Sequence, residues 1–270
     1  MHSNTLAITP TTGGCGADID LDLSQPQEDW VWRDIRHAID EHGVVFFRDQ
    51  HLDSTQYASV ARRFGKPIVP TSDIIPALPG SQEIAEVRKE PEQTKNIGGS
   101  WHTDQAFRPR PYWGTMLLAR EVPEFGGDTA FISMYAAYEA LSDGLKRTLS
   151  GLRGVHSNAA VQARAANGKP AQPDAIHPVV VRHPGSGKSL LYVNPGYTVR
   201  FEGWTEQESK PLLTYLFAHA QRPEFGCRFR WQEGSLAFWD NYSTWHYAVN
   251  DYHGDRRLMH RIVVESEPFS

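Results

Sequence analysis

The sequence carries, in its first half, the stretch Trp101-His102-Thr103-Asp104-Gln105-Ala106-Phe107. Side chains alternate along an extended segment, so His102 and Asp104, two positions apart, point to one face and can bind one metal ion. A distant histidine can complete the set: His246, at the end of the run Trp239-Asp240-Asn241-Tyr242-Ser243-Thr244-Trp245-His246. Two imidazoles and one carboxylate leave three open positions on the ion, which is the arrangement of non-haem Fe(II) enzymes that activate dioxygen.

A His-x-Asp pattern alone is weak in a chain with 12 histidines, but a second pattern supports it. The segment 255–264 reads Asp-Arg-Arg-Leu-Met-His-Arg-Ile-Val-Val, which predicts a strand with Arg257 and Arg261 on the same face. Inward-facing arginines are costly unless they are paired, and a guanidinium binds a carboxylate through two parallel hydrogen bonds. The strand therefore predicts a pocket that holds an anion.

With these residues in place, the chain resembles the taurine dioxygenase (TauD/TfdA) family of Fe(II)/2-oxoglutarate-dependent dioxygenases. The resemblance covers most of the chain in the family's order. It is carried by Gly43-Val44-Val45-Phe46-Phe47-Arg48, Arg63-Phe64-Gly65, Trp101 to Phe107, Gly126-Gly127-Asp128-Thr129, Trp239-Asp240-Asn241 and Met259-His260-Arg261.

The resemblance implies a role for each candidate site residue. His102, Asp104 and His246 would bind Fe(II). Thr129 and Arg257 would hold the far carboxylate of 2-oxoglutarate, with Arg261 nearer the iron, between the cosubstrate and an anionic substrate. The implied reaction consumes O2, hydroxylates or oxidatively cleaves a small organic substrate, and releases succinate and CO2. Because Asp104 is a carboxylate, a hydroxylase is expected rather than a related halogenase.

Pattern and resemblance agree on a mostly β fold with flanking helices around a double-stranded β-helix, the cupin-like jelly-roll. Such a fold would place His-x-Asp and His246 on neighbouring strands at one barrel mouth. The expected elements are helices at 29–42 and 54–64, a helical stretch at 133–149, strands at 44–48, 112–119 and 128–132, a hairpin of 178–183 with 189–194, and a strand pair of 227–232 with 235–240. Thr205 and Glu208 resemble a capping box, but Pro211 predicts a kink or a helix start nearer Ser209.

Length, charge and cysteine content restrict the class of protein. The 270 residues fit one domain over 1–270, and a net charge of −5 gives no basic surface for nucleic acid. No run of apolar residues is long enough to span a membrane and the start lacks a signal peptide, so a cytoplasmic protein is expected. Cys15 and Cys227 are expected as reduced thiols. Related enzymes commonly form homodimers or homotetramers, which makes either state an expectation here.

The substrate is the least determined part of the prediction. Gln105, Phe107 and Arg261 are candidate substrate contacts, and the segment 66–100 is a candidate lid over the site. Pro70 and Gly98 stand where taurine-cleaving members carry a histidine and an asparagine. The loss of both polar groups disfavours taurine, because a buried sulfonate needs several donors.

A larger and more apolar substrate is therefore expected. Apolar lid residues agree with it: Ile68, Val69, Ile74, Ile75 and Leu78. The alternatives are a taurine, alkylsulfonate or alkyl sulfate dioxygenase, a non-oxidative metal-dependent jelly-roll enzyme, and a binding protein on the same scaffold.

Overall fold

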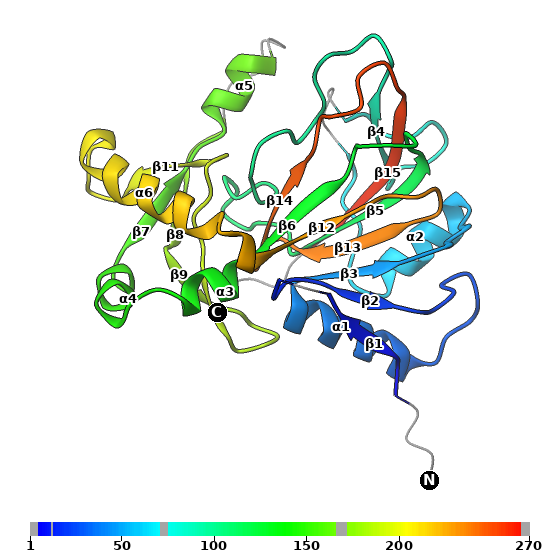
Figure 1. Cartoon of the computed structure of the whole chain (residues 1–270), viewed down its shortest axis with the longest axis horizontal. Helices are drawn as coiled ribbons and strands as arrows, with labels where there is room; N and C mark the ends of the chain where they lie inside the picture. Colours follow the sequence, from blue (N-terminus) through cyan, green and yellow to red (C-terminus); the bar gives the residue numbers. More distant parts are fainter. Residues whose placement is uncertain (1–4, 12, 71–74, 166–171, 266–270) are drawn as a thin grey trace.

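A computed structural model of the chain describes residues 5–11, 13–70, 75–165 and 172–265. Its main feature is a pair of β-sheets (Figure 1). The larger sheet has the strand order β1 (Ile8–Pro10), β2 (Ala17–Ile19), β3 (Val44–Phe47), β13 (Leu236–Asp240), β5 (Gly114–Glu121), β15 (Arg257–Val264) and β4 (Ala85–Lys89). The smaller sheet has the order β12 (Gly226–Phe229), β6 (Thr129–Ser133) and β14 (Thr244–Ala248). Neighbouring strands run antiparallel except β2 and β3.

The two sheets pack face to face through aromatic side chains. Phe46 of β3 lies 4.1 Å from Phe229 of β12 and 5.6 Å from Phe131 of β6, measured between ring centroids. Trp239 of β13 and Met259 of β15 belong to the same cluster. Large apolar side chains from both inner faces fill the space between the sheets, as in other sheet-on-sheet packings. The predicted jelly-roll core with flanking helices is thereby confirmed.

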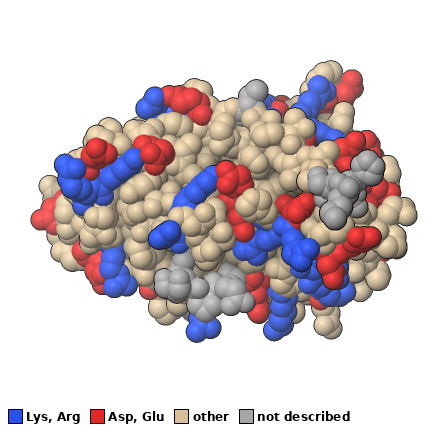
Figure 2. Space-filling view, turned by 90° about the horizontal axis from the view of Figure 1, so that it is seen from below, with Lys and Arg blue, Asp and Glu red and all other residues tan. Residues whose placement is uncertain are grey.

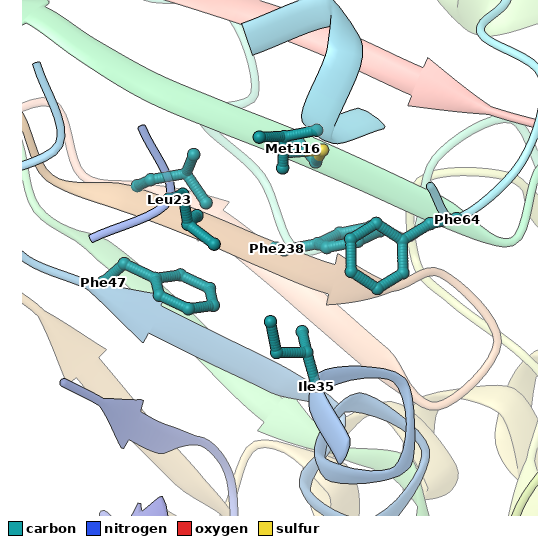
Figure 3. A pocket seen from close by; sticks show the side chains of 8 residues that line it. Leu23, Ile35, Phe47, Phe64, Met116 and Phe238 are labelled. Atoms are coloured by element: carbon teal, nitrogen blue, oxygen red, sulfur yellow. The ribbon is translucent and has the colours of Figure 1, made fainter. Parts of the chain in front are cut away.

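The other face of the larger sheet is covered by helices α1 (Asp29–His42) and α2 (Ser54–Arg62). Period-2 alternation explains this division, because Leu236 and Phe238 face the helices while Ala237 and Trp239 face the smaller sheet. Figure 3 shows a narrow apolar gap on the helix side, between side chains such as Ile35 of α1 and Phe238 of β13, and this gap has no room for a water molecule. No candidate site residue lines this gap, so it belongs to the hydrophobic core.

A second group of elements lies beside the two sheets (Figure 1). Its strands form a three-stranded sheet in the order β11 (Thr198–Phe201), β7 (Arg153–His156) and β8 (Ala175–Pro178), and a hairpin of β9 (Val180–Arg182) and β10 (Ser189–Leu191). Its helices are α3 (Met134–Glu139), α4 (Asp143–Leu149), α5 (Ala159–Ala165), α6 (Glu206–Ala220) and the 3-10 turn η1 (Pro223–Phe225).

Three predictions of local structure were wrong. The helical stretch 133–149 is two helices, because Ser142 caps a new helix by accepting a hydrogen bond from the Leu145 amide. Helix α6 begins at Glu206 rather than near Ser209, since the Thr205–Glu208 capping box forms and α6 continues through Pro211. The strands near 227–232 and 235–240 do not pair with each other: β12 pairs with β6, and β13 pairs with β3 and β5.

The proposed lid, 66–100, is partly built into the larger sheet. Strand β4 pairs with β15 along its length, and Pro67 bridges to Val264. Leu78 packs against the helix-side core, whereas Val69 is 55% exposed. Ile74 lies outside the described residues. A lid that moved as a whole would have to break the β4–β15 ladder, so only the parts outside β4 remain candidates for motion.

The described surface mixes charges of both signs. On the face shown in Figure 2, acidic and basic side chains are interspersed rather than gathered in one patch of a single sign. No helix in the described part of the chain is both long enough and apolar enough to cross a membrane.

Candidate active site

The structure brings His102, Asp104 and His246 together. Their potential ligand atoms all lie within 4.8 Å of one another, in the described part of the chain. Nε2 of His102 is 3.8 Å and Nε2 of His246 is 3.9 Å from Oδ1 of Asp104. Two nitrogens and one oxygen around one point, with no ring nitrogen already bonded to the carboxylate at hydrogen-bond distance, can hold a metal ion between them.

The backbone around this group differs slightly from the prediction. His246 lies in β14, but His102 belongs to no regular strand and forms only an isolated antiparallel bridge with His246. The amide of each histidine donates to the carbonyl of the other, at 2.8 and 3.2 Å. The chain enters a turn at Asp104. The two histidines are therefore neighbours across a bridge rather than across a full strand pair.

A hydrogen bond to the backbone orients the first histidine. Nδ1 of His102 lies 2.7 Å from the Ser100 carbonyl oxygen, so Nδ1–H donates there and Nε2 is left with its lone pair facing Asp104. Burial lowers the pKa of His246 to about 3, with His102 adding to the effect, so this ring is neutral at neutral pH. Neutral imidazoles are the form that binds metal ions.

Asp104 is held by residues from two other strands. Its Oδ2 accepts a hydrogen bond from Thr115 Oγ1 of β5 at 2.8 Å and one from Arg261 Nη2 of β15 at 2.6 Å. The Thr115 hydroxyl in turn accepts from Asn241 Nδ2 at 2.9 Å. Burial by itself would raise the pKa of Asp104, but Arg261, then His246 and His102, outweigh it and hold that pKa well below its usual value. The carboxylate is therefore ionised.

The loop that leads to His246 is braced by a buried hydrogen bond between His183 and Asp240. Nε2 of His183 lies 2.9 Å from Oδ2 of Asp240, and both side chains are almost fully buried. Asp240 also accepts from the Tyr242 amide at 2.8 Å and from the Ser243 hydroxyl at 2.6 Å. These bonds of Asp240 fix the turn between β13 and β14.

Arg257 lies buried at the other end of the same strand face as Arg261. It is 6% exposed, and its Nε and Nη2 atoms have no hydrogen-bond partner among the described residues. Its guanidinium lies over the ring of Trp231, with 5.6 Å from Cζ to the ring centroid, and Trp231 Nε1 donates to Thr129 Oγ1 at 2.9 Å. A buried guanidinium with free donors is costly, so this corner is built to receive an anion such as a carboxylate.

The register places this corner on the same interior face as the metal group. On β6 and β14, Thr129 pairs with Ala248 and Phe131 pairs with His246, so Thr129 and His246 share a face. On β15, Arg257 and Arg261 are four residues apart, which is about 13 Å along a strand. The anion site at Arg257 and the metal site at Asp104, to which Arg261 bonds, therefore lie on the same interior face, as binding of a short dicarboxylate that chelates a metal at one end requires. The residues present therefore fit Fe(II) and 2-oxoglutarate.

Of the three candidate substrate contacts, Phe107 packs against another aromatic side chain. Its ring packs edge to face on Tyr197, with 5.0 Å between centroids. Gln105 adopts a positive φ of 53° and its side-chain oxygen accepts a hydrogen bond from Arg108 Nε. Arg261 touches Asp104 directly.

Tyr197 lies beside the metal group because its neighbour Gly196 contacts His102. A Cβ at Gly196 would lie 2.9 Å from Cβ of His102, so the backbone of 196–197 rests on the first metal-binding candidate. Burial raises the pKa of Tyr197, and the nearby Asp104 carboxylate adds to the rise while Arg261 opposes it. The segment 194–198 therefore lies against the metal group.

Thr115 and Trp231 were not among the site residues predicted from the sequence. Thr115 is a β-branched residue inside an apolar strand, where packing is the ordinary role, and nothing in its local pattern signals a bond to Asp104. Trp231 lies beyond the end of β12, and only the fold brings it to Thr129 and Arg257.

Comparison with known proteins gives the class of this geometry. The sequence profile described as "Taurine catabolism dioxygenase TauD, TfdA family" matches residues 7–263. The chain belongs to this family.

Two relatives and one solved structure illustrate the similarity. The alkylsulfatase of Acinetobacter baylyi is 35% identical over 278 residues, covering 97% of this chain and 86% of the relative. The alpha-ketoglutarate-dependent sulfate ester dioxygenase of Pseudomonas putida is 31% identical, covering 98% of this chain and 91% of the relative. The crystal structure of AAD-2 in complex with Mn(II) and N-oxalylglycine superposes with a TM-score of 0.85 at 26% identity, covering 98% of this chain and 100% of that one.

Membership of this TauD/TfdA family settles the reaction class. The chain is a 2-oxoglutarate-dependent oxygenase, an oxidoreductase that uses Fe(II), 2-oxoglutarate and O2 on a small-molecule substrate. The predictions of family, enzyme class and cofactors are confirmed. The alternatives of a non-oxidative metal enzyme and of a binding protein are set aside, because relatives across nearly the whole chain are named as dioxygenases.

Proposed function

We propose that this enzyme binds Fe(II) through His102, Asp104 and His246, and 2-oxoglutarate through Thr129, Arg257 and Arg261. The observation that carries the second assignment is the buried guanidinium of Arg257, whose Nε and Nη2 lack partners among the described residues. An incoming carboxylate would satisfy both donors, and the Thr129 hydroxyl, which already accepts from Trp231, keeps its own proton to donate.

When bound, Fe(II) and 2-oxoglutarate together supply the activation of O2 and the oxidation of a substrate C–H bond. The chain's own residues prepare that step. Thr115 and Arg261 hold the outer oxygen of Asp104, so its other oxygen is directed at the two histidines. Ser100 fixes the tautomer of His102. Trp239, with its ring centroid 4.8 Å from that of His246, excludes water from one side.

We further propose that the substrate is an alkyl or aryl sulfate ester, or an anion of similar shape, larger and more apolar than taurine. The Phe107–Tyr197 pair offers an aromatic wall beside Asp104. Arg261 donates to Asp104 through Nη2, which among the described residues leaves its other N–H groups as donors for an anion. Pro70 and Gly98 add no polar side chain. The relatives named alkylsulfatase and sulfate ester dioxygenase support the same class.

For a primary sulfate ester the chemistry balances without a further reactant. Hydroxylation of the carbon that bears the ester oxygen consumes O2 and 2-oxoglutarate and releases succinate and CO2. The resulting hemiacetal sulfate breaks its C–O bond to sulfate, with its hydroxyl becoming the carbonyl of an aldehyde. One aldehyde and one sulfate should therefore appear for each succinate.

The metal and cosubstrate assignments are tested by anaerobic optical titration of the apo-enzyme with Fe(II) and 2-oxoglutarate. A visible charge-transfer band of the chelated keto acid is expected in the wild type. His246→Ala should abolish the band, and Arg257→Ala should require much higher 2-oxoglutarate to reach it, because the loss of hydrogen bonds to a charged group costs about 1.5–3 kcal/mol each.

The neighbouring arginine provides a matched control. Arg256 lies on the opposite strand face and pairs with Glu121 at 2.7 Å, so Arg256→Ala removes an equal charge without touching the pocket. If Arg256→Ala and Arg257→Ala weakened the band equally, the dicarboxylate assignment would be wrong. The substrate class is tested by incubating the enzyme with sodium octyl sulfate and measuring sulfate and succinate. Turnover of taurine but not of octyl sulfate would overturn it.

A further inference from the structure

Two histidines outside the proposed metal site lie together in the sheet β11-β7-β8. His156 of β7 and His177 of β8 are 0% and 4% exposed, with ring centroids 5.2 Å apart in an edge-to-face arrangement. The ring of Tyr192 lies 5.6 Å from His156 and 5.5 Å from His177. Burial, with a smaller effect of His177, lowers the pKa of His156 to about 3, and burial also lowers the pKa of His177. Both rings are therefore neutral at neutral pH.

His177 holds the backbone on both sides of Phe107. Its Nε2 lies 3.0 Å from the carbonyl oxygen of Ala106 and 3.0 Å from that of Arg108. Only an N–H can bond to carbonyl oxygens, so the neutral ring carries its proton on Nε2 and shares it between the two. The segment that follows Asp104 is thus tied to β8.

His156 holds the segment that carries Tyr197. Its Nδ1 lies 3.2 Å from Oγ1 of Thr198. That hydroxyl already accepts from the Asn194 amide at 2.8 Å, so its own proton is available to donate to Nδ1. Asn194 Oδ1 accepts from the Tyr197 amide at 2.9 Å, which closes the turn. The 194–198 turn is thus tied to β7.

The two tethered segments meet beside the metal group. Phe107 from one packs on Tyr197 from the other, and Gly196 rests on His102. His177 is therefore bonded next to Phe107, and His156 is bonded next to Tyr197. The two histidine rings also contact each other. If the two histidines only filled space in the core, they would not need hydrogen bonds to the segments that carry Phe107 and Tyr197.

We propose that His156 and His177 are positioning residues that jointly set the Phe107–Tyr197 wall and so determine how well the enzyme binds substrates with an apolar chain. This role rests on the proposed function. The pair bonds to residues next to the two wall residues rather than to a residue assigned to Fe(II) or 2-oxoglutarate, so its loss should change substrate binding and leave cofactor binding intact.

The kinetic test uses sodium octyl sulfate and sodium ethyl sulfate as probes. We expect His177→Ala to raise KM for octyl sulfate roughly ten-fold, because small displacements of binding groups are amplified in binding and catalysis, with a smaller effect on ethyl sulfate. His177→Gln should restore most of the loss, since its amide nitrogen can take the place of Nε2. The Fe(II)/2-oxoglutarate band should keep the wild-type midpoint in both variants.

His219 supplies a matched control. It is also buried, and its Nε2 lies 2.8 Å from a backbone carbonyl, that of Ala137, between α6 and α3. His219→Ala therefore removes the same kind of bond away from the wall and should leave the ratio of the two KM values unchanged. If His219→Ala and His177→Ala shifted this ratio equally, or if His177→Ala weakened the cofactor band as strongly as substrate binding, the positioning role would be wrong.

A second measurement does not depend on activity. Amide hydrogen exchange followed by mass spectrometry should show faster exchange in peptides covering both 105–108 and 194–198 in His177→Ala, because the two segments are coupled through the rings. Unchanged exchange at 194–198 would overturn the joint role. If the wild type failed to turn over either sulfate ester, the proposed substrate class would fail, and the exchange result would still decide the proposal on the histidine pair.

Discussion

Arg261 donates from Nη2 to Oδ2 of Asp104 across 2.6 Å, and this bond divides the carboxylate between two tasks. Oδ2 is occupied by Arg261 and by Thr115, whereas Oδ1 faces the Nε2 atoms of His102 and His246. A carboxylate with one oxygen bonded to the protein is restricted to one-point binding of a metal ion. In the proposed function the same guanidinium would also meet the anionic substrate or the cosubstrate.

Thr115→Val should weaken Fe(II) binding. The substitution keeps the β-branched shape in β5 but removes the hydroxyl that donates to Asp104, and loss of such an outer partner typically lowers metal affinity about 10- to 100-fold. Fe(II) affinity can be measured by anaerobic titration with 2-oxoglutarate in excess. Thr148→Val, on the exposed helix α4, removes a hydroxyl that bonds only to the Gly144 carbonyl and should leave Fe(II) affinity unchanged. Equal affinity of Thr115→Val and wild type would contradict a role in orienting Asp104.

Trp231→Phe should weaken 2-oxoglutarate binding with little effect on Fe(II). It deletes the Nε1–H that donates to Thr129, so the threonine hydroxyl can rotate away from the cosubstrate carboxylate. A neutral hydrogen bond contributes about 1 kcal/mol, which corresponds to roughly a five-fold rise in KM for 2-oxoglutarate. Trp204→Phe, at a partly exposed position, is the control and should leave that KM unchanged. A greater change in Fe(II) affinity than in the KM for 2-oxoglutarate would contradict a role of Trp231 in 2-oxoglutarate binding.

Gly196→Ala should weaken Fe(II) binding although none of the three candidate metal ligands is substituted. The new methyl group would lie 2.9 Å from Cβ of His102 and 3.2 Å from Asn194 Oδ1, closer than carbon atoms normally approach. His102 must shift, so we expect the Fe(II) midpoint to rise by an order of magnitude or more. Gly151→Ala meets no atom within 4 Å and is the control. Normal Fe(II) affinity in Gly196→Ala would show that the loop can move away freely.

His156 should make the fold sensitive to acid. Its folded pKa of about 3 lies below the unfolded value near 6.5, so between these values the unfolded chain binds more protons and stability falls as the pH is lowered. At most this costs about 1.4 kcal/mol per pH unit for one histidine. The ring faces His177 on β8, Tyr192 and Thr198 of β11.

This acid sensitivity is measured by urea denaturation of the apo-enzyme over a series of pH values. His156→Asn should be less stable than the wild type at pH 7, and the difference in free energy of unfolding should shrink towards pH 5. Parallel curves for His156→Asn and wild type would contradict a depressed pKa.

Much of the local structure could be predicted because it depends on neighbours in the sequence. Helix α1 occupies 29–42 as predicted, and β15 places Arg257 and Arg261 on one interior face. Periodicity, a capping box and strand parity are short-range properties, so they are readable before folding. The three predictions that failed concerned the new cap at Ser142, the effect of Pro211 on α6, and the strand partners of β12 and β13.

The sequence by itself determined the chemistry: His102, Asp104 and His246 are the residue types a metal needs, and Arg257 and Arg261 are those a carboxylate needs. Only the tertiary structure decided what orients them. Thr115 bonds to Asp104 from a different element, and Trp231 bonds to Thr129 across 102 positions of the chain. Such contacts follow from strand order and register, which are set by burial of the whole core rather than by any local pattern.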